Sequence, residues 1–348
     1  MFLHGKAAEI SRPGRRPNTV VERLVYSTIV VIFDTVDAVA AVLGWPQPFD
    51  KNLEDRVRIT YHSLPRLALS SGLKRPVESD QWDNAEILKR FDDSEVISTR
   101  GDTVGKIGND TFVKAAWNFP HLEASAIDFV QMRTTIPIPR VRRRFKDKYG
   151  YSIIVMDYIP GERLDHVWPS LSLWSKLWVA LTLRRYIRQL RQINYSVPGP
   201  LADSPETCDG GLFPRPYGPF PDYASLSAFF NRKLDITKDI TYRDDQGNEI
   251  PYADPDTEPF DDSRPLVLAH QDLSMRNIIL GRDGRIWLVD WGMSGFYPWW
   301  FEYVSTVFAA ERDLAPDSWN RLIPLIADPL FKHMRWMGRL GTALIAYK

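Results

Sequence analysis

The chain has 348 residues, of which 44% are hydrophobic and 25% charged, an ordinary globular composition that suits one bilobal unit or two domains. The 44 basic residues balance the 44 acidic ones, and this neutrality disfavours a general nucleic-acid binder, which would be basic. A single cysteine, Cys208, excludes an intramolecular disulfide and is typical of a reducing compartment, or of one where disulfides do not matter.

One apolar stretch, residues 24–45, has the length of a membrane span. Asp34 lies at its centre and Asp37 follows about one turn later. Each aspartate at a bilayer centre costs about 2.5–3.5 kcal/mol, so a buried or amphipathic helix is favoured over a stable membrane span. Basic residues precede the stretch, and a signal or transit peptide therefore stays open as the alternative.

The first 160 residues divide into two parts. Residues 1–90 contain no motif that indicates a function and are expected to form a partly helical N-terminal extension. In residues 91–160, "EVISTR", "TVGKIG" and "TFVKAA" are short β-type runs separated by Gly, Asp and Asn turn signals. "HLEASAIDFVQMRTT" then has helical spacing, and two more strands flank "KDKYGY". The predicted order is three strands, one helix and two strands.

The remaining part, residues 161–348, is expected to be mainly helical. Residues 170–193 and "SLSAFFNRKLDI" have the spacing of helices, and the last fifty residues or so also look helical. Between the first two helices, residues 197–223 are dense in Pro and Gly, which predicts a loop. The runs "NIIL" and "RIWLVD" are joined through Asp283-Gly284, a strong hairpin signal.

Three polar side chains surround this hairpin. Asp272 and Asn277 lie in "HQDLSMRNIIL" before its first strand, and Asp290 lies in "LVDWG" after its second. A hairpin brings its ends together, so Asn277 and Asp290 can meet at one point and hold a hard cation such as Mg²⁺, which prefers oxygen ligands. Asp272 then remains free to orient or deprotonate a hydroxyl.

This division of roles is how kinase-like phosphoryl transfer is built, with H-x-D-x-x-x-x-N followed by D-F-G. His270 begins the first pattern and is expected to hold the loop by hydrogen bonds, and Trp replaces Phe in the second pattern. Upstream, Lys114 in the third strand and Glu123 in the following helix could form the ion pair that aims a lysine at nucleotide phosphates. Lys106 is the rival lysine, but Glu123 would then follow the wrong strand.

Within that superfamily the chain resembles the aminoglycoside phosphotransferase and choline kinase branch, and its fungal-type members in particular. Ser274 stands where protein Ser/Thr kinases typically carry lysine, and no A-P-E segment follows Asp290. Instead, "GFYPWWFEYVSTVF" and "DGGLFPRPYGPF" are similar to stretches of the fungal phosphotransferases. The similarity covers about residues 95–310, so the first 90 residues lie outside it.

The resemblance implies an α+β, bilobal, protein-kinase-like fold, with a small five-stranded N-terminal lobe, a larger helical lobe and ATP in the cleft between them. It implies ATP-dependent phosphorylation of a small-molecule hydroxyl, with Mg²⁺ as cofactor. Because such a kinase uses cytosolic nucleotide, a cytoplasmic location is expected. The residues expected to bind the nucleotide are Lys114, Glu123, the backbone groups of Asp157 and Ile159, and the pocket-lining Met156, Ile279 and Val289.

The acceptor and the activity leave alternatives open. Residues 244–262 hold eight acids and no Lys or Arg, and this loop could attract a cationic acceptor or be only a solvated surface loop. A non-catalytic nucleotide-binding or interaction protein of the same fold is the second reading. It is disfavoured because every catalytic position is filled. A protein kinase is the third.

Overall fold

The computed structural model describes residues 77–98, 102–116, 120–202, 206–238, 242–243, 249–250 and 258–346. The apolar stretch 24–45 and most of the acidic segment 244–262 lie outside the described residues, so the expectations for them remain predictions. Within the described ranges, no helix is both long enough and apolar enough to cross a membrane.

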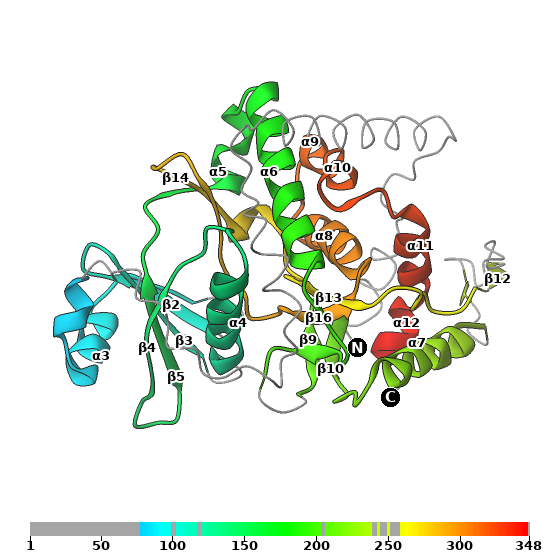
Figure 1. Cartoon of the computed structure of the whole chain (residues 1–348), viewed down its shortest axis with the longest axis horizontal. Helices are drawn as coiled ribbons and strands as arrows, with labels where there is room; N and C mark the ends of the chain where they lie inside the picture. The colour runs from blue at the N-terminus through cyan, green and yellow to red at the C-terminus, as the bar shows by residue number, and fades with distance from the viewer. Residues whose placement is uncertain are drawn as a thin grey trace.

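An antiparallel five-stranded sheet forms the N-terminal part of the α+β fold (Figure 1). Its strand order is β1-β2-β3-β5-β4, and the helix α4 lies between β3 and β4 in the chain. The predicted order of three strands, one helix and two strands is confirmed. The bounds are β1 (Val96–Ser98), β2 (Asp102–Ile107), β3 (Thr111–Ala116), α4 (Pro120–Arg133), β4 (Val141–Lys146) and β5 (Ser152–Asp157).

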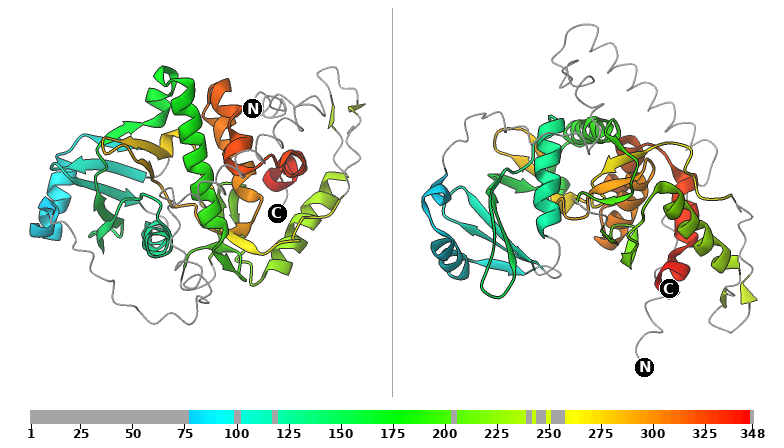
Figure 2. Two further views of the ribbon diagram at one scale, coloured as in Figure 1. Left: turned by 45° about the horizontal axis from the view of Figure 1, so that its top comes forward. Right: turned by 60° about the horizontal axis from the view of Figure 1, so that its bottom comes forward.

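Helices cover both faces of this sheet, because residues of a strand point alternately to its two sides. The outer face packs on α3 (Asn84–Asp92), through Ile87 and Phe91 against Val113 and Val155. Figures 1 and 2 show α3 on the side away from the large helical part and α4 on the side that faces it. Residue 90 lies within α3, and the 3-10 helix η2 (Glu78–Gln81) contacts the sheet through the Thr111 hydroxyl, which donates to Ser79 Oγ at 3.0 Å.

The chain leaving the sheet runs directly against the predicted hairpin. Strand β6 (Gly161–Arg163) pairs with β14 (Ile278–Gly281), which pairs with β15 (Ile286–Leu288). A Cβ atom on Gly161 would lie 2.4 Å from the carbonyl oxygen of Leu280, so only glycine allows this approach. The pairing couples the connection between the two parts to the hairpin that carries Asn277 and Asp290.

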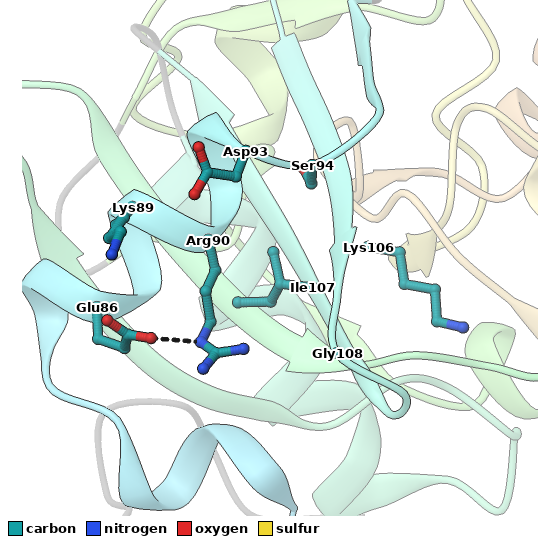
Figure 3. Close-up of a pocket in the computed structure, with 8 residues that line it drawn as sticks. All are labelled: Glu86, Lys89, Arg90, Asp93, Ser94, Lys106, Ile107 and Gly108. Carbon is teal, nitrogen blue, oxygen red and sulfur yellow. Dashed lines mark hydrogen bonds and ion pairs between the residues drawn. The ribbon is translucent and has the colours of Figure 1, made fainter.

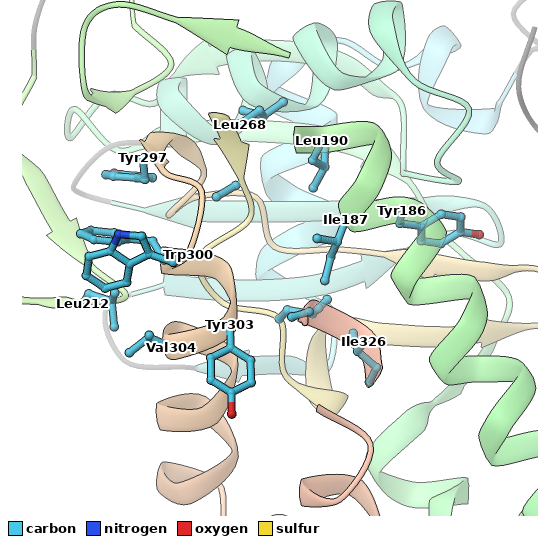
Figure 4. Close-up of a cluster of buried hydrophobic side chains, with 14 of the residues drawn as sticks. Tyr186, Ile187, Leu190, Leu212, Leu268, Tyr297, Trp300, Tyr303, Val304 and Ile326 are labelled. Atoms are coloured by element: carbon cyan, nitrogen blue, oxygen red, sulfur yellow. The ribbon is translucent and has the colours of Figure 1, made fainter. Parts of the chain in front are cut away.

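Helices dominate the C-terminal part, and α6 and α8 line its core together with a small sheet (Figure 4). The α6 N-terminus is capped by Ser172, whose hydroxyl accepts from the Ser175 N–H at 3.1 Å. The helices are α5 (Leu164–Val167), η3 (Trp168–Ser170), α6 (Leu173–Arg191), α7 (Tyr223–Lys238), η4 (Met275–Asn277), α8 (Phe301–Arg312), α9 (Asp317–Asn320), α10 (Ile323–Ala327), α11 (Phe331–Arg339) and α12 (Gly341–Ala346).

Several short strands here were not expected from the sequence. One sheet has four strands in the order β7-β13-β16-β8. Two separate two-stranded sheets are formed by β9 with β10 and by β11 with β12. The Pro- and Gly-rich stretch 197–223, predicted to be loop throughout, contains three of these strands, and that prediction was wrong in part. The strands are β7 (Asn194–Tyr195), β8 (Gly199–Pro200), β9 (Cys208–Gly210), β10 (Phe213–Tyr217), β11 (Tyr242–Arg243), β12 (Glu249–Ile250), β13 (Leu266–Ala269) and β16 (Gly295–Pro298).

Candidate active site

Lys114 lies at the centre of a group of three carboxylates, called here the lysine cluster. Its Nζ is 2.8 Å from Glu123 of α4, 2.9 Å from Asp102 of β2 and 3.0 Å from Asp290, which follows β15. The predicted pair of Lys114 and Glu123 is therefore present. Asp102 was missed, because in sequence it was interpreted only as a turn residue beside Gly101. The cluster joins the N-terminal sheet to the end of the C-terminal hairpin.

The charges of the lysine cluster follow from burial and proximity. Burial alone would lower the pKa of Lys114, but Glu123, Asp290 and Asp102 outweigh it and raise that pKa above its ordinary value. Burial raises the pKa of Glu123, while Lys114 opposes the rise. Burial would also raise the pKa of Asp290, but Lys114 prevails and the pKa is lowered. At neutral pH Lys114 is thus a cation and Asp290 an anion.

The rival lysine has a different environment. Lys106 Nζ lies 4.2 Å from the centre of the Tyr158 ring, a cation–π contact outside the lysine cluster. Lys106 is one of the residues that line a pocket of about 420 Å³ between α3 and β2, but Figure 3 shows its side chain directed away from the other lining residues. This pocket lies on the α3 side of the sheet, whereas Glu123 approaches Lys114 from α4, on the opposite side.

Hydrogen bonds from both the side chain and the backbone of His270 hold the loop after β13. The His270 Nδ1 accepts from the Asp272 N–H at 3.3 Å, so its Nε2 carries the proton and donates to the Val289 carbonyl at 3.1 Å. Glu302 of α8 accepts from the N–H groups of His270 and Gln271 at 2.6 and 3.3 Å. Burial raises the pKa of Glu302, offset in part by His270 and by these two bonds. His270 and Glu302 thus fix the backbone beside Asp272.

Both carboxylate oxygens of the buried Asp272 carry hydrogen bonds. Arg312 Nη2 donates to Oδ1 at 2.8 Å, and Asn277 Nδ2 and Arg276 Nη2 donate to Oδ2. Neither arginine was predicted to take part. The spacing of four residues between Asp272 and Arg276 is a signal that could have found that pair, but Arg312 lies 40 residues downstream and no local pattern connects it to Asp272.

Asn277 and Asp290 stand at the two ends of the hairpin, as predicted. The Val289 N–H donates to the Asn277 carbonyl at 3.0 Å, which extends the β14–β15 ladder towards Asp290. Because Asn277 Nδ2 is bound to Asp272, its Oδ1 is the atom of the amide that can meet a cation. Asp290 has a left-handed backbone, with φ of 64°.

This donor set is suited to Mg²⁺ shared with phosphate. Among the described residues, no group of three or more His, Cys, Asp or Glu side chains is arranged to hold a metal ion. Mg²⁺ commonly takes only one or two protein ligands and completes its shell with phosphate oxygens and water. The Asp290 carboxylate and the Asn277 amide oxygen match that requirement.

The residues predicted to line a nucleotide pocket lie along β5 and the hairpin. Met156 packs with α4, and Ile279 is paired to β6. The Asp157 N–H donates to the Arg140 carbonyl at 3.0 Å, so this N–H is excluded as a donor to adenine. Of the peptide N–H groups of Asp157 and Ile159, the Ile159 N–H is therefore the candidate that remains.

Fold and site together define a class of protein. The chain has a protein-kinase-like α+β fold, with an N-terminal sheet and a helical C-terminal part, and the two parts meet at the lysine cluster. The family described as "Phosphotransferase enzyme family" matches residues 118–323, more than half of the chain, and the chain belongs to that family. No curated protein matches this chain.

Solved structures similar to this chain include three aminoglycoside phosphotransferases. A GDP complex of a mutant aminoglycoside 2'-phosphotransferase IIIa is 14% identical over 74% of this chain and 86% of its own, with a TM-score of 0.46. The enzyme APH(3'')-Id from Streptomyces rimosus is 13% identical, over 75% and 98%, with a TM-score of 0.41. A thermostable mutant of APH(4)-Ia with ADP and hygromycin B is 12% identical, over 75% and 97%, with a TM-score of 0.40.

Proposed function

We propose that the protein transfers the γ-phosphoryl group of ATP, with Mg²⁺, to a hydroxyl group of a small molecule. The observation that carries this proposal is the position of Lys114, within 3.0 Å of both Glu123 and Asp290. A lysine held in that way, beside a hairpin that ends in Asn277 and Asp290, supplies the cation and the metal ligands that phosphoryl transfer needs. Membership of the phosphotransferase family supports the same reaction class.

The nucleotide would be held from both sides of the lysine cluster. Lys114, kept in place by Glu123, would contact the phosphates, and Asp290 and Asn277 would hold Mg²⁺. When bound, Mg²⁺ neutralises negative charge that develops on the phosphate oxygens. Adenine would bind at the Ile159 N–H and the Asp157 carbonyl. Its pocket would be lined by Met156, Ile279 and Val289.

Asp272 would act on the acceptor. Its carboxylate is fixed by Asn277, and the backbone beside it is fixed by Glu302 and His270. The acceptor oxygen would form a bond to the γ-phosphorus, the bond from that phosphorus to the β–γ bridging oxygen would break, and ADP would leave. Asp272 would orient the hydroxyl and take its proton, which then passes to water.

The proposal also covers the branch of the family and the kind of acceptor. The aromatic stretch "GFYPWWFEYVSTVF" supports placement in the fungal-type branch of the family, and Ser274 supports a small-molecule acceptor over a protein acceptor. The proposed lobes are residues 77–160 and 161–346, because η2 and α3 lie with the N-terminal sheet.

A second candidate function is nucleotide binding without transfer. The observation that favours it is the occupation of both Asp272 oxygens by arginine, since an acceptor hydroxyl must find a place at this carboxylate. The two functions share the lysine cluster and differ only at Asp272, so they are separable by experiment.

The test is a phosphate-transfer screen over hydroxyl-bearing small molecules with Mg²⁺-ATP. The protein is compared with Asp272→Asn and with Asp283→Asn, an exposed aspartate in the turn of the same hairpin. The proposal expects transfer that is lost in Asp272→Asn and kept in Asp283→Asn. Stabilisation by Mg²⁺-ATP without transfer to any acceptor would support the non-catalytic function instead, and no stabilisation by Mg²⁺-ATP would refute both.

A further inference from the structure

Asp272 forms the buried end of a closed ring of four charged side chains. Arg276 donates to Asp272 and to Asp313, and Arg312 donates to the same two carboxylates. The Asp272 side chain is only 3% exposed, whereas the two arginines and Asp313 are each about one third exposed. The side chains of Arg276, Arg312 and Asp313 in this arginine–aspartate ring therefore lie between solvent and the Asp272 carboxylate, at which the acceptor hydroxyl would bind.

The hydrogen bonds leave one defined position for an acceptor hydroxyl. A carboxylate oxygen accepts about two hydrogen bonds. Oδ2 of Asp272 already accepts from Asn277 and Arg276, whereas within the described part of the chain Oδ1 accepts from Arg312 alone. Under the proposed function, the incoming hydroxyl would therefore bind at Oδ1, beside the Arg312 guanidinium.

Arg312 has donors to spare at that position. Its Nε donates to Asp313 at 3.0 Å and its Nη2 to Asp272 at 2.8 Å, so two of its five N–H groups are used by described residues. A guanidinium with outward N–H groups matches the flat, two-oxygen geometry of a carboxylate, and the hydrogen bonds are strengthened by charge. Lysine or a neutral amide at this position would match that geometry less well.

We infer that Arg312 is a specificity-determining residue which selects acceptors carrying a carboxylate next to the phosphorylated hydroxyl. This inference rests on the proposed function and narrows its acceptor to hydroxy acids. A hydroxy acid would place its hydroxyl at Asp272 Oδ1. Its carboxylate would accept from the Arg312 N–H groups that do not donate to any described residue.

The acidic segment offers less support for a cationic acceptor. Three of its acids, Glu258, Asp261 and Asp262, contact other side chains of the C-terminal part. Asp261 accepts from His333 of α11, and Asp262 accepts from Ser227 of α7. Glu258 pairs with Lys332, also of α11. These contacts tie the end of the segment to α7 and α11, while the acceptor position is bordered by the end of α8.

The experiment compares three probes of one skeleton that differ in charge: L-lactate, lactamide and 1-amino-2-propanol. Binding is measured by calorimetry with the full chain, Mg²⁺ and a non-hydrolysable ATP analogue. The wild-type protein is expected to bind lactate at least about ten-fold more tightly than lactamide, equivalent to about 1.4 kcal/mol, and to bind the amine most weakly. Arg312→Gln should abolish the preference, and Arg312→Lys should retain part of it.

Arg285→Gln is the matched control, because Arg285 is an exposed arginine that pairs with Asp283 in the hairpin turn, away from Asp272. It should keep the full preference for lactate. Equal affinity for lactate and lactamide, including no binding of either at about 100 mM, overturns the inference. So does a preference that survives in Arg312→Gln. The ATP analogue should stabilise wild type and Arg312→Gln alike; loss of that stabilisation in the wild type would refute the proposed function instead.

Discussion

The pair of Lys114 and Glu123 can be tested by removing one charge and then both. Lys114→Met keeps the length of the side chain but leaves Glu123, which is 4% exposed, without its partner at 2.8 Å, and it removes the same cation from Asp102 and Asp290. Glu123→Gln in the same chain then removes the stranded carboxylate and keeps its shape. The double variant should therefore recover much of the stability that the single variant loses.

The magnitude follows from the distance. At 2.8 Å and an effective dielectric constant of about 20, the attraction of the pair is about 6 kcal/mol, and desolvation offsets part of it. Removing one partner of a buried pair typically destabilises by about 3–5 kcal/mol, whereas replacing both is often close to neutral. We expect Lys114→Met to lose about 3 kcal/mol and the double variant to recover more than half of that loss.

Urea unfolding measures the stability, and a thermal shift with Mg²⁺-ATP measures nucleotide binding. The control is Lys106→Met, which removes a lysine whose ammonium group lies over the Tyr158 ring, outside the lysine cluster, and should cost less than about 1 kcal/mol. Nucleotide stabilisation should vanish in Lys114→Met and in the double variant, but persist in Lys106→Met. The reasoning is wrong if the stability losses of Lys114→Met and Glu123→Gln simply add in the double variant. It is also wrong if Lys106→Met loses nucleotide binding and Lys114→Met does not.

Three further changes test the other parts of the site and the core. Asp290→Asn should abolish the Mg²⁺-dependent part of the thermal shift with ATP while the fold stays intact, and an unchanged shift would remove Asp290 from the metal site. Asp272→Asn should keep ATP affinity and lower turnover by about 10²–10⁴-fold, and activity within a few fold of wild type would contradict its role. Asp328→Asn should destabilise by about 3 kcal/mol at pH 7, because it removes the carboxylate charge that pairs with the buried Arg184 and with Arg191. Burial would raise the pKa of Asp328, but Arg191 and Arg184 outweigh it and lower that pKa below 3.8, so its stabilisation is complete above that value and is lost as the pH falls through the folded pKa. The difference in unfolding free energy between wild type and Asp328→Asn should therefore shrink in acid, and a difference that stays constant to pH 2 would argue against the ion pair.

Local patterns in the sequence determined much of the architecture. Short β-type runs separated by Gly, Asp and Asn turn signals predicted the strands before α4, and two runs flanking "KDKYGY" predicted the strands after it. Asp283-Gly284 predicted the β14–β15 hairpin, and the hairpin in turn placed Asn277 and Asp290 together. The kinase-like order of a strand lysine followed by a helix glutamate indicated the pair of Lys114 and Glu123, which the structure contains.

Only the tertiary structure decided the contacts that no local pattern records. Short strands such as β7 and β8 have two residues each, too few for a period to be visible. The packing of α3 on the outer face of the sheet joined residues 84–92 to a lobe they precede in the chain. Asp102 became a third partner of Lys114, and Arg312 reached Asp272 across 40 residues, because separate strands and helices pack with these side chains facing one another. The sequence does not show which way a charged side chain points, because its orientation depends on how its helix or strand packs. At this site the packing determines which charged groups an acceptor would contact.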